Sequence, residues 1–145
     1  RSLLVHQFLY KNGFPQWDSY AEEKSQKLKE IVKVHKENIS VAYEEGVNIV
    51  MGTDSGVIPH GHNLKELLNL VDIGMTPKQA ISAGTTKAAE FLGKEDVGSI
   101  KEGKCADIIF LEKNPLVDIE LLANSDNIVG VIQDGKEVKN RCGVM

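Results

Sequence analysis

Cysteine is scarce in this chain, with Cys105 and Cys142 the only two among 145 residues. Two cysteines this far apart provide neither a disulfide framework nor the paired CxxC spacing of a zinc site. The sequence also lacks an apolar run long enough to span a bilayer, and no signal-peptide pattern is visible. We therefore expect a cytoplasmic protein that makes no contact with a membrane.

An excess of positive charge is missing as well. The formal net charge is −4 and the sequence pI is about 5.6. A nucleic-acid-binding surface needs a basic patch, so this class of partner is disfavoured. Hydrophobic residues make up 41% and charged residues 26% of the chain, which is typical of a soluble globular protein. A length of 145 residues is sufficient for one domain with a hydrophobic core.

Several common catalytic motifs do not occur. No stretch has the GxxxxGK spacing of a phosphate-binding loop, and no GxSxG turn presents a serine nucleophile. Neither cysteine has a histidine close to it in the sequence, so thiol catalysis has little support.

The most informative stretch is a Val- and Ile-rich run at residues 47–51 that ends in a glycine-flanked turn containing Asp54. Such a run predicts a buried strand, and strands buried on both faces are typical of parallel α/β sheets. Chemistry in those sheets occurs just past the carboxyl ends of the strands, which would place Asp54 at the mouth of a site. The alternative is that Asp54 caps the next helix or closes a turn.

Helical periodicity predicts a long helix from about Ser19 to Gly46 and short helices at residues 64–73 and 87–92. A further helix should begin at Thr76, with Pro77 at its first position and Gln79 completing a capping box. A capping box is also expected at Ser19–Glu22, and residues 1–17 fit either a strand or a short helix before a loop. Glycines should end the helices at positions 46, 74 and 93.

Beyond Val97 the character of the sequence changes. Short β-prone runs lie at residues 105–111, 128–133 and 136–139. Asp134-Gly135 joins the last two runs and is a strong hairpin signal. We place a boundary near residues 93–97, which divides the chain into segments 1–93 and 94–145.

The histidine pair His60-Gly61-His62 allows two interpretations. Residues two apart in a strand point to the same side, so such a pair could hold one metal ion. Here Pro59 precedes the pair and a predicted helix follows it, which indicates a loop. A loop histidine that contacts substrate or faces solvent is the preferred interpretation.

Several short motifs follow one another in a fixed order. They are residues 42–47, 52–56, 59–63, 65–67, 74–81, 83–89 and 97–107. Their order and spacing resemble the C-terminal third of the metal-dependent amidohydrolase superfamily, and above all its imidazolonepropionase-like and Xaa-Pro dipeptidase (prolidase-like) members. The resemblance runs from about residue 18 to about residue 139.

The resemblance implies an α/β fold made of the C-terminal segment of a (β/α)8 barrel, followed by strands of a small β-sandwich. Residues 47–51 would form the last barrel strand, and residues 64–92 the terminal barrel helices. Asp54 would be a ligand of a catalytic divalent metal, usually zinc, and would accept a proton from the attacking water. His60, Ser55 and Asn63 would contact the substrate.

The resemblance also implies that most metal ligands precede Arg1, because the family carries them on earlier strands. One carboxylate cannot hold zinc usefully, so we expect no tight metal and no activity from this chain alone. The complete parent is expected to hydrolyse carbon–nitrogen bonds of a small amide, cyclic amide or dipeptide-like substrate. The alternative is a non-catalytic fragment or interaction module that self-associates or binds the missing N-terminal part of the barrel.

Overall fold

The computed structural model describes residues 21–54, 60–141 and 143, with the backbone alone at 21–26 and 28. The assignment of residues 1–17 and the capping box beginning at Ser19 lie outside the described residues. None of the described helices is both long and apolar enough to cross a membrane. In chain order the elements are α2 (Ala21–Glu44), η2 (Asn63–Lys65), α3 (Glu66–Asp72), α4 (Pro77–Ala83), α5 (Thr86–Phe91), β1 (Ile108–Leu111), η3 (Ile119–Ala123), η4 (Ser125–Asn127), β2 (Ile128–Gln133) and β3 (Lys136–Asn140).

The predicted glycines end their helices through a common backbone motif. After α2, Gly46 has a φ of +80°, and the N–H of Val47 donates to the carbonyl of Ala42 at 2.9 Å. This is a Schellman motif, in which glycine adopts the left-handed conformation at no steric cost. The same pattern of positive φ and backbone hydrogen bonds follows α3 at Gly74 and α5 at Gly93. These three predictions are confirmed.

The capping box at the start of α4 is also confirmed. The backbone N–H of Gln79 donates to Oγ1 of Thr76 at 3.3 Å, and the backbone N–H of Thr76 donates to Oε1 of Gln79 at 2.9 Å. Pro77 occupies the first helical position, where its missing N–H costs nothing.

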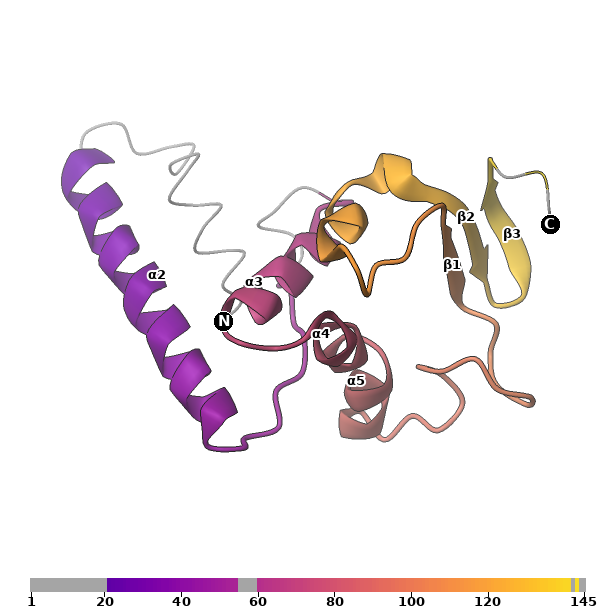
Figure 1. Ribbon diagram of the computed structural model, residues 1–145, viewed down its shortest axis with the longest axis horizontal. Coiled ribbons are helices and arrows are strands. Elements are labelled where there is room, and N and C mark those ends of the chain that lie inside the picture. The colour runs from indigo at the N-terminus through magenta and orange to yellow at the C-terminus, as the bar shows by residue number, and fades with distance from the viewer. Residues whose placement is uncertain (1–20, 55–59, 142, 144–145) are drawn as a thin grey trace.

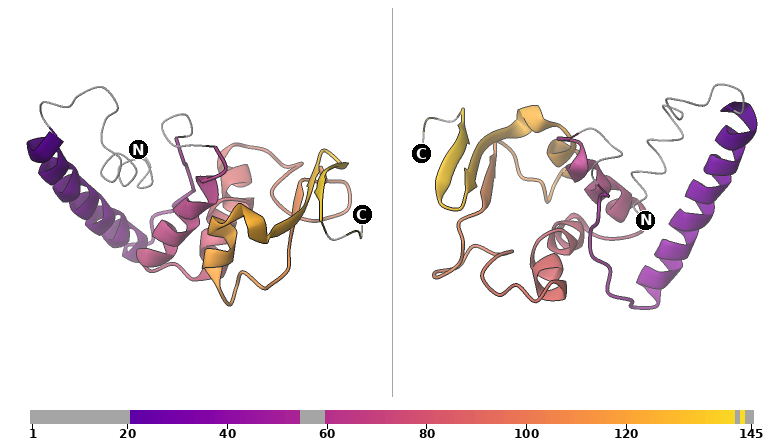
Figure 2. Two further views of the ribbon diagram at one scale, coloured as in Figure 1. Left: turned by 90° about the horizontal axis from the view of Figure 1, so that it is seen from above. Right: turned by 180° about the vertical axis from the view of Figure 1, so that it is seen from behind.

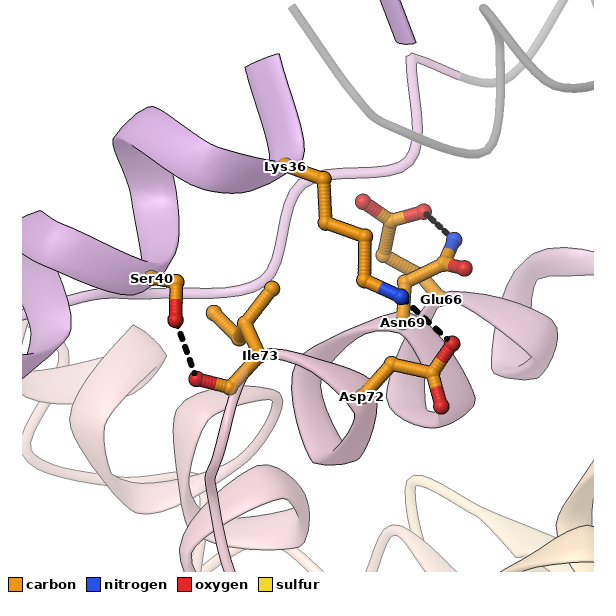
Figure 3. Close-up of polar contacts among 6 residues, drawn as sticks. All are labelled: Lys36, Ser40, Glu66, Asn69, Asp72 and Ile73. Atoms are coloured by element: carbon orange, nitrogen blue, oxygen red, sulfur yellow. Dashed lines mark hydrogen bonds and ion pairs between the residues drawn. The ribbon is translucent and has the colours of Figure 1, made fainter. Parts of the chain in front are cut away.

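Helices α3 and α4 and the 3-10 segment η3 enclose the core. Its buried residues are Leu67, Leu70, Ile73, Met75, Ala80, Ala83, Ile119 and Leu122. The C-terminal half of α2 packs against α3: Oγ of Ser40 donates to the carbonyl of Ile73 at 3.1 Å, and Nζ of Lys36 lies 3.0 Å from Oδ2 of Asp72 (Figure 3). The short helices therefore lie between α2 on one side and the sheet on the other (Figure 1), an arrangement that two further views repeat (Figure 2).

The sheet is antiparallel, in the order β1-β2-β3. Its β2–β3 hairpin is the predicted one, and both turn residues have positive φ, +50° at Asp134 and +71° at Gly135. This is the type I′ geometry that matches the twist of a hairpin. Oδ1 of Asp107, just before β1, accepts a hydrogen bond from the N–H of Asp134 at 2.8 Å and so ties the turn to the first strand.

The expected strand at residues 47–51 is the main difference from the sequence analysis. The structure describes this segment but forms no strand there. A strand exists only through hydrogen bonds to neighbouring strands, and the described part of the chain offers 47–51 no such neighbour. The assignment of residues 1–93 to a barrel and of residues 94–145 to a β-sandwich stays a prediction. The boundary near residues 93–97 also stays a prediction.

Candidate functional site

The segment that leads to Asp54 is held against the end of α4. The backbone N–H of Met51 donates to the carbonyl of Ala83 at 2.9 Å, and Ile49 and Met51 pack against the core. The Met51 side chain lies over Gly84, where an added Cβ would stand only 3.2 Å from its Cε atom. The core thus fixes the path of the backbone three residues before the predicted catalytic carboxylate.

Asp54 itself is exposed and has a φ of +51°. Few non-glycine residues adopt this left-handed conformation, and Asp tolerates it better than most because its short side chain can bond locally. Unusual backbone conformations of this kind cluster at functional sites. An accessible carboxylate at the end of a docked segment is suited to bind a cation or accept a proton. The next predicted site residue, Ser55, lies outside the described residues.

His60 and His62 are both exposed, and Gly61 between them has a φ of +86°. The carbonyl of His62 accepts a hydrogen bond from the N–H of Lys65 at 3.0 Å, whereas its side chain makes no cap to η2. Within the described ranges, no group of three or more His, Cys, Asp or Glu side chains is placed to hold a metal ion. The described residues therefore do not fit a complete metal site.

Asn63 begins η2 and is half-buried. Its Oδ1 atom is inaccessible to solvent and has no hydrogen-bond partner. A buried acceptor left in this state costs about 1–3 kcal/mol, so native proteins rarely keep one without a reason.

Two buried polar residues that follow Asn63 in the chain were missed by the sequence analysis. Glu66 and Asn69 are only 5% and 6% exposed, and Nδ2 of Asn69 donates to Oε2 of Glu66 at 3.1 Å (Figure 3). Each also makes a further interaction. The available signal was a pair of polar residues three apart inside a run of leucines, since such a pair shares a face with the apolar positions.

A second group of titratable side chains surrounds the exposed thiol of Cys105. Desolvation raises the pKa of this thiol above its usual value, and the carboxylates of Asp96, Asp134 and Asp107 raise it further. A raised pKa leaves less thiolate at neutral pH, which argues against a nucleophilic role for Cys105.

Comparison with known families identifies the class. The model of the amidohydrolase family matches residues 11–138. The chain therefore belongs to the amidohydrolase family, as the resemblance of its motifs predicted.

Two relatives and one solved structure show which members of the family this chain resembles. Ochratoxinase from Aspergillus niger is 34% identical over 139 residues, which cover 94% of this chain and 28% of that protein. Imidazolonepropionase from Haloarcula marismortui is 30% identical over 98 residues, which cover 66% of this chain and 23% of that protein. The crystal structure of a Xaa-Pro dipeptidase with bound methionine in the active site superposes with a TM-score of 0.80 at 34% identity, covering 95% of this chain and 33% of that one. The chain thus spans about a third or less of the proteins it resembles.

Proposed function

We propose that this chain is the C-terminal portion of a hydrolase that acts on carbon–nitrogen bonds. Membership of the amidohydrolase family supports this reaction class, and the names of ochratoxinase, imidazolonepropionase and Xaa-Pro dipeptidase among its relatives agree with it. The substrate class would be a small amide, a cyclic amide or a dipeptide-like molecule. The single observation that carries the proposal is the exposed carboxylate of Asp54 at the end of the segment docked on α4.

Asp54 would act in the complete protein as a metal ligand and as the acceptor of the proton released by the attacking water. A divalent metal, zinc in our proposal, would supply a Lewis acid that polarises the substrate and acidifies water. The remaining ligands would come from outside this chain. His60, Ser55 and Asn63, which follow Asp54 in the chain, would contact the substrate.

The organisation proposed for the parent follows from the same reasoning. Residues 1–93 would belong to its barrel and residues 94–145 to its β-sandwich. Large apolar side chains exposed in this chain would be covered there, among them Phe91 at 76%, Leu92 at 68% and Ile100 at 80% exposure. The same exposure favours a second candidate function, a non-catalytic module that binds another chain or itself through this apolar surface.

Asp54→Asn in the complete protein tests the proposal. The substitution keeps the size of the side chain but removes its charge and basicity, so turnover of an amide should fall by at least about a hundredfold. Asp72→Asn is the matched control, because Asp72 is also exposed and lies on α3. Unchanged circular dichroism would show that the fold is intact. A turnover number close to that of the wild type would refute the role of Asp54.

A further inference from the structure

The turn between β2 and β3 carries a dipeptide whose two residues can react with each other. Asp134-Gly135 is the one Asp-Gly pair in the sequence, and both residues are exposed. The carboxyl carbon of an aspartate lies close to the backbone nitrogen of the next residue, and a bond between them gives a cyclic imide. Glycine hinders this closure least because it has no Cβ. The exposed Asp118 is followed instead by Ile119, whose branched side chain shields the backbone nitrogen.

Two hydrogen bonds hold the peptide groups on either side of Asp134. Its own N–H donates to Oδ1 of Asp107 at 2.8 Å, and the N–H of Gly135 donates to the carbonyl of Ala106 at 3.1 Å. Both acceptors lie directly before β1, so a segment distant in the sequence fastens the turn. The orientation of the two peptide groups is therefore set by the sheet as well as by the turn.

Closure of the imide ring breaks the second of these bonds. The peptide group between Asp134 and Gly135 must rotate to bring the nitrogen to Cγ of Asp134. An imide nitrogen carries no hydrogen, so nothing remains to donate to Ala106. The turn must also leave its type I′ geometry, in which φ is +50° at Asp134 and +71° at Gly135. The folded sheet thus opposes a reaction that the sequence favours.

We propose that Asp134 is a site of isoaspartate formation, and that the bonds to Asp107 and Ala106 keep the reaction slow in the folded chain. The nitrogen of Gly135 attacks Cγ of the protonated carboxyl group of Asp134. The N–Cγ bond forms, the C–OH bond breaks, and the amide hydrogen leaves with the hydroxyl as water.

A second water molecule then opens the imide at one of its two carbonyls. Opening at Cγ restores aspartate, whereas opening at the former main-chain carbonyl gives isoaspartate. The modification needs only water and is independent of the proposed hydrolase activity.

Isoaspartate at this position would change the sheet. Its main chain runs through Cβ and Cγ, so one extra carbon enters the turn, and the former main-chain carbonyl becomes a free carboxylate. The pairing of Gln133 with Lys136 closes the hairpin around two residues, and a lengthened turn no longer matches it. Strand β3 should therefore lose its register with β2.

Ageing of the complete protein at physiological temperature and pH tests the proposal. Electron-transfer fragmentation of the tryptic peptide 114–136 distinguishes isoaspartate from aspartate at position 134. A synthetic peptide of residues 128–140 supplies the rate without the fold. The folded protein should form isoaspartate at least about tenfold more slowly than the peptide, because two hydrogen bonds must open first.

Variants of Asp107 test the part that its carboxylate plays. Asp107→Ala removes one acceptor and should raise the rate about fivefold, the factor that one hydrogen bond is worth. Asp107→Asn keeps an acceptor oxygen and should stay near the wild-type rate. Asp118→Ala is the matched control, because Oδ1 of Asp118 accepts from the N–H of Glu120 at 3.0 Å and caps η3 instead of the hairpin. It should leave the rate at Asp134 unchanged.

Three results would overturn the proposal: no isoaspartate in the peptide, equal rates in peptide and folded protein, or an unchanged rate in a folded Asp107→Ala variant. Should Asp107→Ala fail to fold by circular dichroism, Asp134→Asn keeps the test open. An Asn-Gly pair closes with loss of ammonia, so the folded variant and a peptide with the same substitution compare protection while Asp107 stays intact. Equal rates in that pair would again refute protection by the fold.

Discussion

Gly98 is the position where a single added methyl group should do most damage. A Cβ there would stand 2.7 Å from Cβ of Ala89 and 2.9 Å from the carbonyl oxygen of Thr85. Both neighbours belong to α5 or its N-cap, and a backbone carbonyl cannot yield unless the helix shifts. Gly98 also has a φ of +80°, which L-residues avoid. Gly98→Ala therefore combines a steric clash with a conformational penalty.

The two penalties can be estimated separately. The left-handed conformation costs a residue with a Cβ roughly 1–2 kcal/mol. Overpacking of a well-filled site costs about 1–3 kcal/mol. Gly98→Ala should thus lower the free energy of unfolding by about 2–5 kcal/mol. Gly103→Ala is a matched control, because Gly103 has a φ of +83° but no atom within 4 Å of an added Cβ. It should lose only the conformational part.

Urea unfolding followed by far-UV circular dichroism, at one chain concentration throughout, measures the difference. The midpoint of Gly98→Ala should lie roughly 0.3–3 M below that of Gly103→Ala, because an overpacking penalty of about 1–3 kcal/mol is divided by a denaturant slope of about 1–3 kcal/mol/M. Equal midpoints for the two variants would show that the contact between Gly98 and α5 is not a tight one.

Three further outcomes are expected. In the complete protein, His60→Ala should raise KM or lower kcat without changing metal content by elemental analysis, since His60 is exposed in a loop; loss of metal would make it a ligand. Alkylation of Cys105 in a Cys142→Ser background should be slow at mildly alkaline pH, because the raised pKa of the thiol leaves little thiolate. Asp96→Asn should lower that pKa and accelerate the alkylation. An unchanged rate would show that Asp96 does not raise the pKa of Cys105. The isolated chain should show no hydrolase activity and no stoichiometric zinc. It should sediment as an associated or partly ordered species, because the outer edges of β1 and β3 are unpaired within the described sheet. A compact monomer with a sharp, concentration-independent thermal transition would contradict this.

Local features were the most predictable part of the structure. The glycines after α2, α3 and α5, the capping box at Thr76 and the turn at Asp134-Gly135 each depend on a few neighbouring residues. Such features can be predicted from the sequence, because the required backbone angles and caps select particular residue types.

Features that depend on distant partners were less predictable. The run at residues 47–51 has the composition of a strand, but composition cannot supply the neighbouring strand that hydrogen bonding requires. The burial of Glu66 and Asn69 was missed because polar residues on a helix are ordinarily assigned to solvent. At the candidate site, the strand and turn pattern indicated Asp54, and the family resemblance implied Asn63. The left-handed conformation of Asp54 and the unpaired oxygen of Asn63 became visible only in the folded chain.

The hydrogen bond from the N–H of Asp134 to Asp107 gives the sheet two unequal ends. At the turn, the start of β1 is fastened to the hairpin by this bond and by a second one from the N–H of Gly135 to the carbonyl of Ala106. At the opposite end of the β1–β2 ladder, the register shifts after Phe110, whereas the shift in the β2–β3 ladder lies between Val131 and Ile132. Fraying should begin where Leu111 faces Ile128 and proceed toward the turn. The sheet would then open from that end, and the contact between Asp107 and the turn would be the last to break.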